Sequence, residues 1–156
     1  PIFYSQPRLG KGAKAFNILK FRTMKQNAEA EGIKNAEEND PRITKVGNFL
    51  RKTRLDEVPQ FWDVLRGEMS LVGPRAERPE LVAEYQKQIP FYRARLLVKP
   101  GLTGWAQISH KYGDTIEDTV IKLEYDLYYI KYLSTELDVF VMFHTLKTVL
   151  TGRGAQ

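Results

Sequence analysis

The spacing of apolar residues is the feature that most restricts how this chain folds. Between residues 116 and 130 they recur at intervals of four, three, four and three positions: Ile116, Val120, Leu123, Leu127 and Ile130. Between residues 58 and 65 they occupy positions i, i+3, i+4 and i+7: Val58, Phe61, Trp62 and Leu65. Both patterns predict amphipathic helices with the apolar stripe turned to the core. Helices are therefore expected to dominate the fold.

Three further segments carry signals of helices. In residues 43–55 basic residues crowd around apolar ones, which predicts a basic amphipathic helix. Another helix is expected from about Pro79, because proline is tolerated in the first turn, and a last one from about Thr135 to Leu150. The polar segment 25–40 is rich in helix formers and predicts an exposed helix or loop.

The N-terminal part of the chain follows a different pattern. Two apolar segments that contain aromatic residues flank Gly10, Lys11 and Gly12, which predicts a β-hairpin closed by a loose turn. The glycine pair lacks the Lys-Ser/Thr ending of a phosphate loop, so the turn is preferred. The hairpin and the helices together predict a predominantly helical α+β fold, with residues 1–156 forming a single domain.

Charge and composition limit the possible partners. The chain has 24 Lys and Arg against 19 Asp and Glu, a net charge of +5, which favours an anionic partner: nucleic acid, a phosphorylated substrate or an acidic membrane surface. Cysteine is absent, so disulfides and thiolate chemistry are excluded, and a metal would need oxygen ligands. The longest apolar run, 139–143, is far shorter than the roughly 20 residues of a spanning helix. The start without Met suggests a piece of a longer protein.

Asp56 and Glu57 form an acidic pair directly before the helix expected to start at Pro59. Free N–H groups and the dipole at a helix N-terminus stabilise a nearby anion by about 0.3–1 kcal/mol, so the pair is compatible with an ordinary helix start. Cations from separate segments indicate a second interpretation; they are Lys20, Arg22, Arg51, Lys52, Arg54 and Arg75. Such cations would let a phosphorylated substrate approach carboxylates, where one can attack phosphorus or hold a divalent metal.

Four stretches of the chain, in this order, resemble one known family: "FNILKFRTM", "FLRKTRLDEVPQFWDVLRGEMSLVGPR", "KPGLTGWAQI" and "YDLYYIKYLSTELDVFVMFHTL". They are similar to the bacterial sugar transferases, the monotopic polyprenyl-phosphate phosphoglycosyl transferases, over nearly the whole chain. The resemblance implies transfer of a sugar 1-phosphate from a nucleotide diphosphate sugar, commonly a UDP-sugar, to undecaprenyl phosphate. UMP is released, Mg2+ is required, and the reaction is the first membrane step of exopolysaccharide, capsule or O-antigen synthesis.

The resemblance also implies roles for individual residues. Asp56 matches the nucleophile that forms a covalent phosphosugar intermediate, and Glu57 matches its partner, a general base or a group that holds the local geometry. Four basic residues are expected around the substrate phosphates: Lys20, Arg22, Arg51 and Arg75. Asp56 is expected on the metal, and Asp126 on the metal or on the sugar side of the site. A tyrosine-rich helix such as the one around Asp126 is more often a core or interfacial face. Ala76 replaces the second proline of the family's Pro-Arg-Pro and predicts a less rigid loop at Arg75.

The resemblance also implies that the protein works at a membrane. Members of the family have a re-entrant membrane helix before the position where this sequence starts, and work at the cytoplasmic face of the bacterial inner membrane. The aromatic segments 89–97 and 139–146 are candidates for contact with the membrane surface. A homo-oligomer is possible in the full-length protein. Two alternatives remain: a basic nucleic-acid-binding module, disfavoured because the cations surround carboxylates, and an inactive membrane-surface scaffold.

Overall fold

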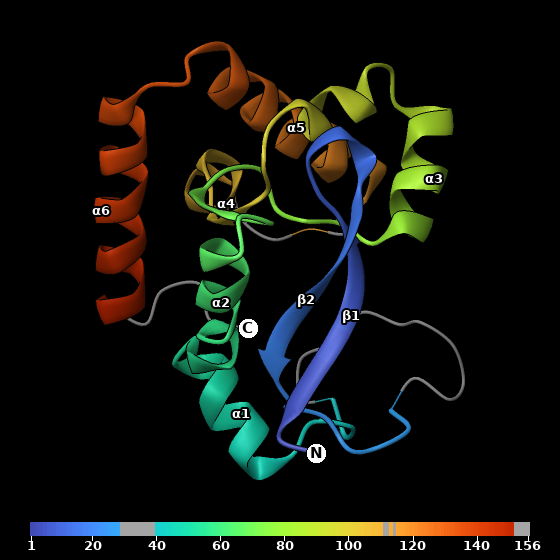
Figure 1. Cartoon of the computed structure of the whole chain (residues 1–156), viewed down its shortest axis with the longest axis vertical. Coiled ribbons are helices and arrows are strands. Elements are labelled where there is room, and N and C mark those ends of the chain that lie inside the picture. Colours follow the sequence, from blue (N-terminus) through green and yellow to red (C-terminus); the bar gives the residue numbers. More distant parts are fainter. Residues whose placement is uncertain (29–39, 111–112, 114, 152–156) are drawn as a thin grey trace.

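The computed structural model describes residues 1–28, 40–110, 113 and 115–151, and within them the fold is the predicted helix-rich α+β arrangement (Figure 1). The α-helices are α1 (Lys45–Lys52), α2 (Gln60–Leu65), α3 (Pro79–Gln88), α4 (Trp105–Ser109), α5 (Ile116–Lys131) and α6 (Thr135–Thr151). The strands are β1 (Phe3–Leu9), β2 (Ala15–Phe21), β3 (Ser70–Val72) and β4 (Gly101–Thr103). Short 3-10 helices are η1 (Lys11–Ala13), η2 (Leu55–Glu57) and η3 (Tyr92–Leu97). Most of the predicted polar segment 25–40 lies outside the described residues.

The N-terminal hairpin is confirmed. β1 and β2 pair antiparallel from Phe3 opposite Phe21 to Leu9 opposite Ala15, and η1 makes the turn. Gly12 has φ +68, a left-handed conformation that glycine adopts without strain. In Figure 1 the hairpin crosses the middle of the molecule, with α1 and α2 on one side of it and α3 on the other. It is therefore placed to contribute side chains to a site between these elements.

The structure has a second sheet, in which β3 and β4 are parallel, and the sequence analysis did not predict it. Ser70 pairs with Gly101 and Val72 with Thr103, and a parallel bridge continues the pairing to Arg75. The connection between the strands contains α3 and η3, as a parallel pair requires a long crossover. The backbones approach so closely that a Cβ on Gly101 would overlap the backbone nitrogen of Gly73. Glycine at 101 is thus a packing requirement.

The hydrophobic core consists of three clusters of buried residues. The first joins the hairpin to the segments around β3: Phe16, Ile18, Met69 and Ala76. The second lies where α3, η3 and α5 meet: Val82, Ile89, Tyr92 and Leu123. The third joins β3, α5 and α6: Val72, Tyr129 and Val141. The apolar stripe predicted for 116–130 is thus largely confirmed: Leu123 is buried, Val120, Leu127 and Ile130 pack against the clusters, and Ile116 is 37% exposed. The helix α6 contributes Val141, which is fully buried, and Leu137, which is partly buried.

The prediction that the apolar stripe of α2 faces the core is wrong. Phe61 is 50% exposed and Trp62 is 57% exposed, whereas Gln60 and Asp63 are buried. The reason is a backbone donor on the hairpin: the N–H of Leu19 in β2 donates to Asp63 Oδ2 at 3.0 Å, so the polar side of α2 turns inward. The expected helix start at Pro59 is also corrected, because α2 begins at Gln60.

Exposed apolar side chains also occur in α1 and η2, next to α2 in the chain. We call this set the α1–α2 apolar face: Val46, Phe49, Leu55, Val58, Phe61, Trp62 and Leu65, each at least 42% exposed. Of the helices in the described part of the chain, none is both long and apolar enough to cross a membrane.

Candidate active site

A cavity of about 390 Å³ opens beside the hairpin and lies within the size range of small-molecule sites. Its wall comes from six parts of the chain: the hairpin, α1 with η2, the loop after β3 with α3, η3, α4 with the segment after it, and α5. Among the described residues the lining includes eight cationic side chains: Arg8, Lys20, Arg51, Arg54, Arg75, Arg78, Arg95 and Lys122. Only four acidic ones accompany them: Asp56, Glu57, Glu77 and Asp126. The cavity is therefore strongly suited to an anion.

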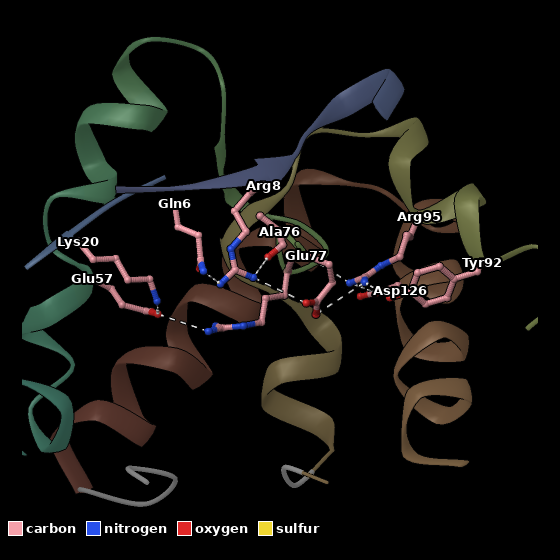
Figure 2. Close-up of polar contacts among 10 residues, drawn as sticks. Gln6, Arg8, Lys20, Glu57, Ala76, Glu77, Tyr92, Arg95 and Asp126 are labelled. Atoms are coloured by element: carbon pink, nitrogen blue, oxygen red, sulfur yellow. Dashed lines mark hydrogen bonds and ion pairs between the residues drawn. The ribbon is translucent and has the colours of Figure 1, made fainter. Parts of the chain in front are cut away.

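Glu57 is held by two of these cations (Figure 2). Its Oε1 lies 2.7 Å from Lys20 Nζ and 3.6 Å from Arg75 Nη2. Burial alone would raise the pKa of Glu57, but Lys20 and Arg75 outweigh burial and lower the pKa to about 2. The pKa of Lys20 is lowered too, by burial first, although Glu57 works against this. Arg75 adds to the lowering of the pKa of Lys20, because a second positive charge nearby disfavours the protonated amine.

Asp56 lies beside Glu57 in η2 and lines the same cavity. Burial raises the pKa of Asp56, and the neighbouring Glu57 carboxylate adds to the rise, while Lys20, Arg51 and Arg54 oppose it. Adjacent carboxyl groups with pKa values pushed in opposite directions are a recurrent sign of distinct chemical roles. The turn that separates them from α1 depends on Arg54, which has the left-handed φ of 59.

The other predicted site residues divide into two groups. Arg51 lines the cavity, and its Nε donates to Thr23 Oγ1 at 2.9 Å, so its position depends on the segment after β2. Arg22 is not among the lining residues, and its guanidinium instead donates to the carbonyl oxygens of Pro1 at 3.1 Å and Phe3 at 3.4 Å. The structure therefore brings Lys20, Arg51 and Arg75 to the acidic pair and places Arg22 at the open end of the hairpin.

Every carbonyl of the loop 74–77 accepts a hydrogen bond. Gly101 N donates to Pro74 O at 2.9 Å and Leu9 N donates to Glu77 O at 3.0 Å. Between them, Arg95 Nη2 donates to Arg75 O and Arg8 Nη1 donates to Ala76 O, each at 3.0 Å. Ala76 itself is 5% exposed and packs in the core. The loop that carries Arg75 is therefore bound on both sides even without a second proline.

Asp126 projects from α5 into a buried ion pair and is only 2% exposed. Its Oδ2 lies 2.8 Å from Arg95 Nη2, and Arg95 Nη1 donates to the hydroxyl of Tyr92 at 2.8 Å (Figure 2). Burial raises the pKa of Asp126 to about 6 against the opposing effect of Arg95. Despite burial, the pKa of Arg95 is raised, because Asp126, Tyr92 and Glu77 surround it, so the guanidinium stays charged.

Three residues of this network were not identified from the sequence: Arg8, Glu77 and Arg95. Arg8 lies within a strand, and Arg95 lies in the aromatic segment that was interpreted as a membrane contact. Tyr92 and Arg95 in that segment are in fact buried, while Phe91 is 82% exposed. Among the described residues, no cluster of three or more His, Asp or Glu is arranged to hold a metal ion.

The fold and this cavity define a site suited to an anion, with two adjacent carboxyl groups whose pKa values are shifted in opposite directions. Residues 1–152 match the family model described as bacterial sugar transferase. The chain belongs to the bacterial sugar transferase family, and this membership disfavours the nucleic-acid-binding alternative.

Curated relatives cover nearly all of the chain. It is 49% identical over 156 residues to UDP-N-acetylgalactosamine-undecaprenyl-phosphate N-acetylgalactosaminephosphotransferase of Aeromonas hydrophila, covering 100% of this chain and 37% of the relative. It is 45% identical over 148 residues to UDP-glucose:undecaprenyl-phosphate glucose-1-phosphate transferase of Escherichia coli K12, covering 94% and 32%. It is 42% identical over 167 residues to galactosyl transferase CpsE of Streptococcus agalactiae, covering 100% and 36%. The chain thus spans about a third of the length of these relatives.

Proposed function

We propose that this chain transfers a sugar 1-phosphate from a UDP-sugar to undecaprenyl phosphate and releases UMP. The observation that carries the proposal is the acidic pair inside a cavity with twice as many cationic as acidic side chains among its described lining residues. Neighbouring anions repel a diphosphate by about 4 kcal/mol per pair of unit charges at 4 Å and a dielectric of 20, so the excess cations are what such a donor needs. The names of two relatives, which specify UDP-sugars and undecaprenyl phosphate, support the same substrates.

Asp56 is the nucleophile in this proposal. One carboxylate oxygen forms a bond to the phosphorus that bears the sugar, and the bond from that phosphorus to the bridging oxygen breaks, so that UMP leaves with the electron pair. A phosphate oxygen of undecaprenyl phosphate then attacks the same phosphorus and releases the Asp56 carboxylate. Asp56 is partly buried but borders the cavity, so it is accessible to both substrates.

Glu57 has a different role, because its pKa of about 2 makes it a weak base at neutral pH. We assign it to holding Lys20 and Arg75 beside the attacked phosphorus. Lys20 and Arg75 then stabilise the negative charge that the phosphate oxygens carry during transfer. Arg51 is the third cation in reach of the donor phosphates, since it lines the same cavity from α1.

Mg2+ is proposed as the cofactor, held by the Asp56 carboxylate together with the phosphate oxygens of the donor. This ligand set fits the ion, which is commonly bound by one or two carboxylates and substrate phosphates. When bound, Mg2+ would neutralise charge on the diphosphate. The sequence also predicted Asp126 as a ligand, but its carboxylate is engaged by Arg95 at 2.8 Å, so coordination would require breaking that ion pair.

The membrane partner is proposed to bind at the α1–α2 apolar face. Phe49, Phe61 and Leu65 on this face are 61%, 50% and 78% exposed, and the basic residues Lys45 and Lys52 lie on α1. Apolar side chains flanked by Lys are suited to the surface of an anionic leaflet. The acidic pair in η2 lies in the chain between α1 and α2, so docking there would bring the lipid-borne phosphate near Asp56. We place this contact at the cytoplasmic face of the bacterial inner membrane.

The direct test is UMP release by the intact protein in vesicles that contain undecaprenyl phosphate, with UDP-sugars and Mg2+. Wild-type protein should release UMP, and Asp56→Asn should not. Glu80→Gln, at an exposed position of α3, is the matched control and should retain activity. Incubation with donor alone should leave a phosphosugar adduct on the peptide that contains Asp56, detected by mass spectrometry. Vesicle binding without any turnover would instead favour the scaffold alternative.

A further inference from the structure

We propose that Arg8, Arg95 and Asp126 form a positioning network that fixes Arg75 for the reaction, with Asp126 acting through Arg95 rather than on a metal or the substrate. The inference rests on the proposed function, because the effect of the network is measured as the rate of sugar-phosphate transfer. None of the three residues needs to touch the donor for this role.

The first step concerns the two arginines. Arg95 reaches the loop 74–77 from η3 and Arg8 reaches it from β1, and they bind consecutive carbonyls, those of Arg75 and Ala76, at 3.0 Å each. Figure 2 shows the two side chains converging on the loop from opposite directions, with Glu77 between them. Glu77 completes the bridge, since its carboxylate oxygens lie 3.8 Å from Arg8 Nη1 and 3.8 Å from Arg95 Nη1.

The second step concerns the orientation of Arg95. Its Nη2 carries two hydrogens and has two acceptors: Asp126 Oδ2 at 2.8 Å and the carbonyl oxygen of Arg75 at 3.0 Å. Because a guanidinium is planar and rigid, directing one N–H to the carboxylate also fixes where the other points. The side chain of Arg95 is 7% exposed and that of Asp126 is 3% exposed, so water cannot easily replace either acceptor. Asp126 therefore sets the direction of the bond that holds the backbone of Arg75.

The third step connects this anchor to the site. The Arg75 side chain is 35% exposed, lines the cavity and lies 3.6 Å from Glu57. Its backbone is held by Arg95 on one side and by the parallel bridge to Gly101 on the other. A shift of about 1 Å in a group that positions a substrate can cost about 100-fold in rate. Loss of the network should therefore lower kcat/KM for the donor by removing the contribution that Arg75 makes to it.

The test is a double-mutant cycle in the intact protein, reconstituted with undecaprenyl phosphate, UDP-sugar and Mg2+. Asp126→Asn should lower kcat/KM for the donor by about 10- to 100-fold. In an Arg75→Ala background the same substitution should cause no further loss, because its effect passes through Arg75. The Mg2+ concentration that gives half-maximal activity should stay the same in Asp126→Asn. Arg95→Lys keeps a charge beside Asp126 but loses the second hydrogen bond, and should behave like Asp126→Asn.

Three results would overturn the inference. They are a raised Mg2+ requirement in Asp126→Asn, which assigns the residue to the metal; an equal loss of kcat/KM in both backgrounds; and a loss in the Asp40→Asn control as large as that in Asp126→Asn. If Asp126→Asn does not fold, Arg8→Lys is measured instead, in the wild-type and Arg75→Ala backgrounds, because Arg8 holds the same loop from the hairpin.

Asp40→Asn is the matched control, since it removes a buried carboxylate that lies 2.6 Å from Arg42 and outside the cavity. Asp40→Asn should lower the melting temperature but leave kcat/KM within about twofold of wild type. If it lowered kcat/KM as much as Asp126→Asn does, the effect of Asp126 would be explained by lost stability alone and not by positioning of Arg75. Inactive wild-type protein would refute the proposed function instead.

Discussion

Glu57→Gln is the substitution whose effect can be worked out most fully from the structure. The side chain of Glu57 is 15% exposed and is paired with Lys20 and Arg75 at 2.7 and 3.6 Å. Its pKa is lowered from 4.5 to about 2, and one pKa unit corresponds to about 1.4 kcal/mol. The ionised carboxylate therefore contributes about 3 kcal/mol to the free energy of unfolding at pH 7, which the neutral amide cannot supply.

The sign of the pH dependence follows from the lowered pKa. A carboxylate with a lower pKa in the folded state stabilises it above the unfolded pKa of 4.5, and this stabilisation is lost as the pH falls toward about 2. The gap between wild type and Glu57→Gln should thus be largest at neutral pH and shrink on acidification. Thermal unfolding should show a decrease of about 6–12 °C at pH 7, given about 2–4 °C per kcal/mol for a chain of this size.

The control for this measurement is Glu80→Gln, which changes the same functional group at an exposed position of α3. It should melt within about 1–2 °C of wild type, as substitutions at the surface usually change stability by less than 0.5 kcal/mol. Equal melting temperatures for the two variants at pH 7 would show that Lys20 and Arg75 do not stabilise the Glu57 carboxylate. A gap that stays constant between pH 7 and pH 3 would contradict the electrostatic origin of the effect.

Three further outcomes are expected. Gly101→Ala should destabilise the protein by about 2–4 kcal/mol, measured by thermal unfolding, because its Cβ would overlap the backbone at Gly73, whereas Gly12→Ala, in open space, should cost only about 1 kcal/mol. Phe61→Ser should weaken sedimentation with anionic vesicles without lowering the melting temperature, since Phe61 is half exposed; unchanged sedimentation would argue against the α1–α2 apolar face as the membrane contact. Arg51→Ala should reduce kcat/KM for the donor at least tenfold and Arg22→Ala less than twofold, because only Arg51 lines the cavity; the reverse order would place the phosphates nearer the open end of the hairpin.

The sequence predicted elements whose signals are local. The hairpin around Gly10 and Gly12, the helix starting at Pro79 and the last two helices all depend on neighbouring residues, and the structure confirms them. The proximity of Lys20, Arg51 and Arg75 to the acidic pair was also predicted, from the number of cations in the flanking segments and from the family resemblance. These parts of the site lie in motifs that are continuous in sequence.

What the sequence missed depends on contacts between distant segments. The apolar stripe on α2 has regular helical spacing, but periodicity alone does not show which side of the helix faces the hairpin. The N–H of Leu19 needs an acceptor and finds it in Asp63, so the polar side of α2 faces the hairpin. The pairing of β3 with β4 rests on three residues in each strand, too few for a recognisable pattern. Arg8 and Arg95 bind backbone carbonyls, and a carbonyl leaves no trace in the sequence that could indicate such a partner.

The parallel pairing of Ser70 with Gly101 has a consequence for the order of folding. The hairpin closes a short loop and can form within microseconds, whereas the β3–β4 pair must close a segment of about 30 residues, at a larger entropic cost, before any of its contacts are gained. Arg75 takes its place only through the second event, because its backbone bridges to Gly101. The cationic wall of the cavity should therefore be completed late in folding, after most of the helical content has formed.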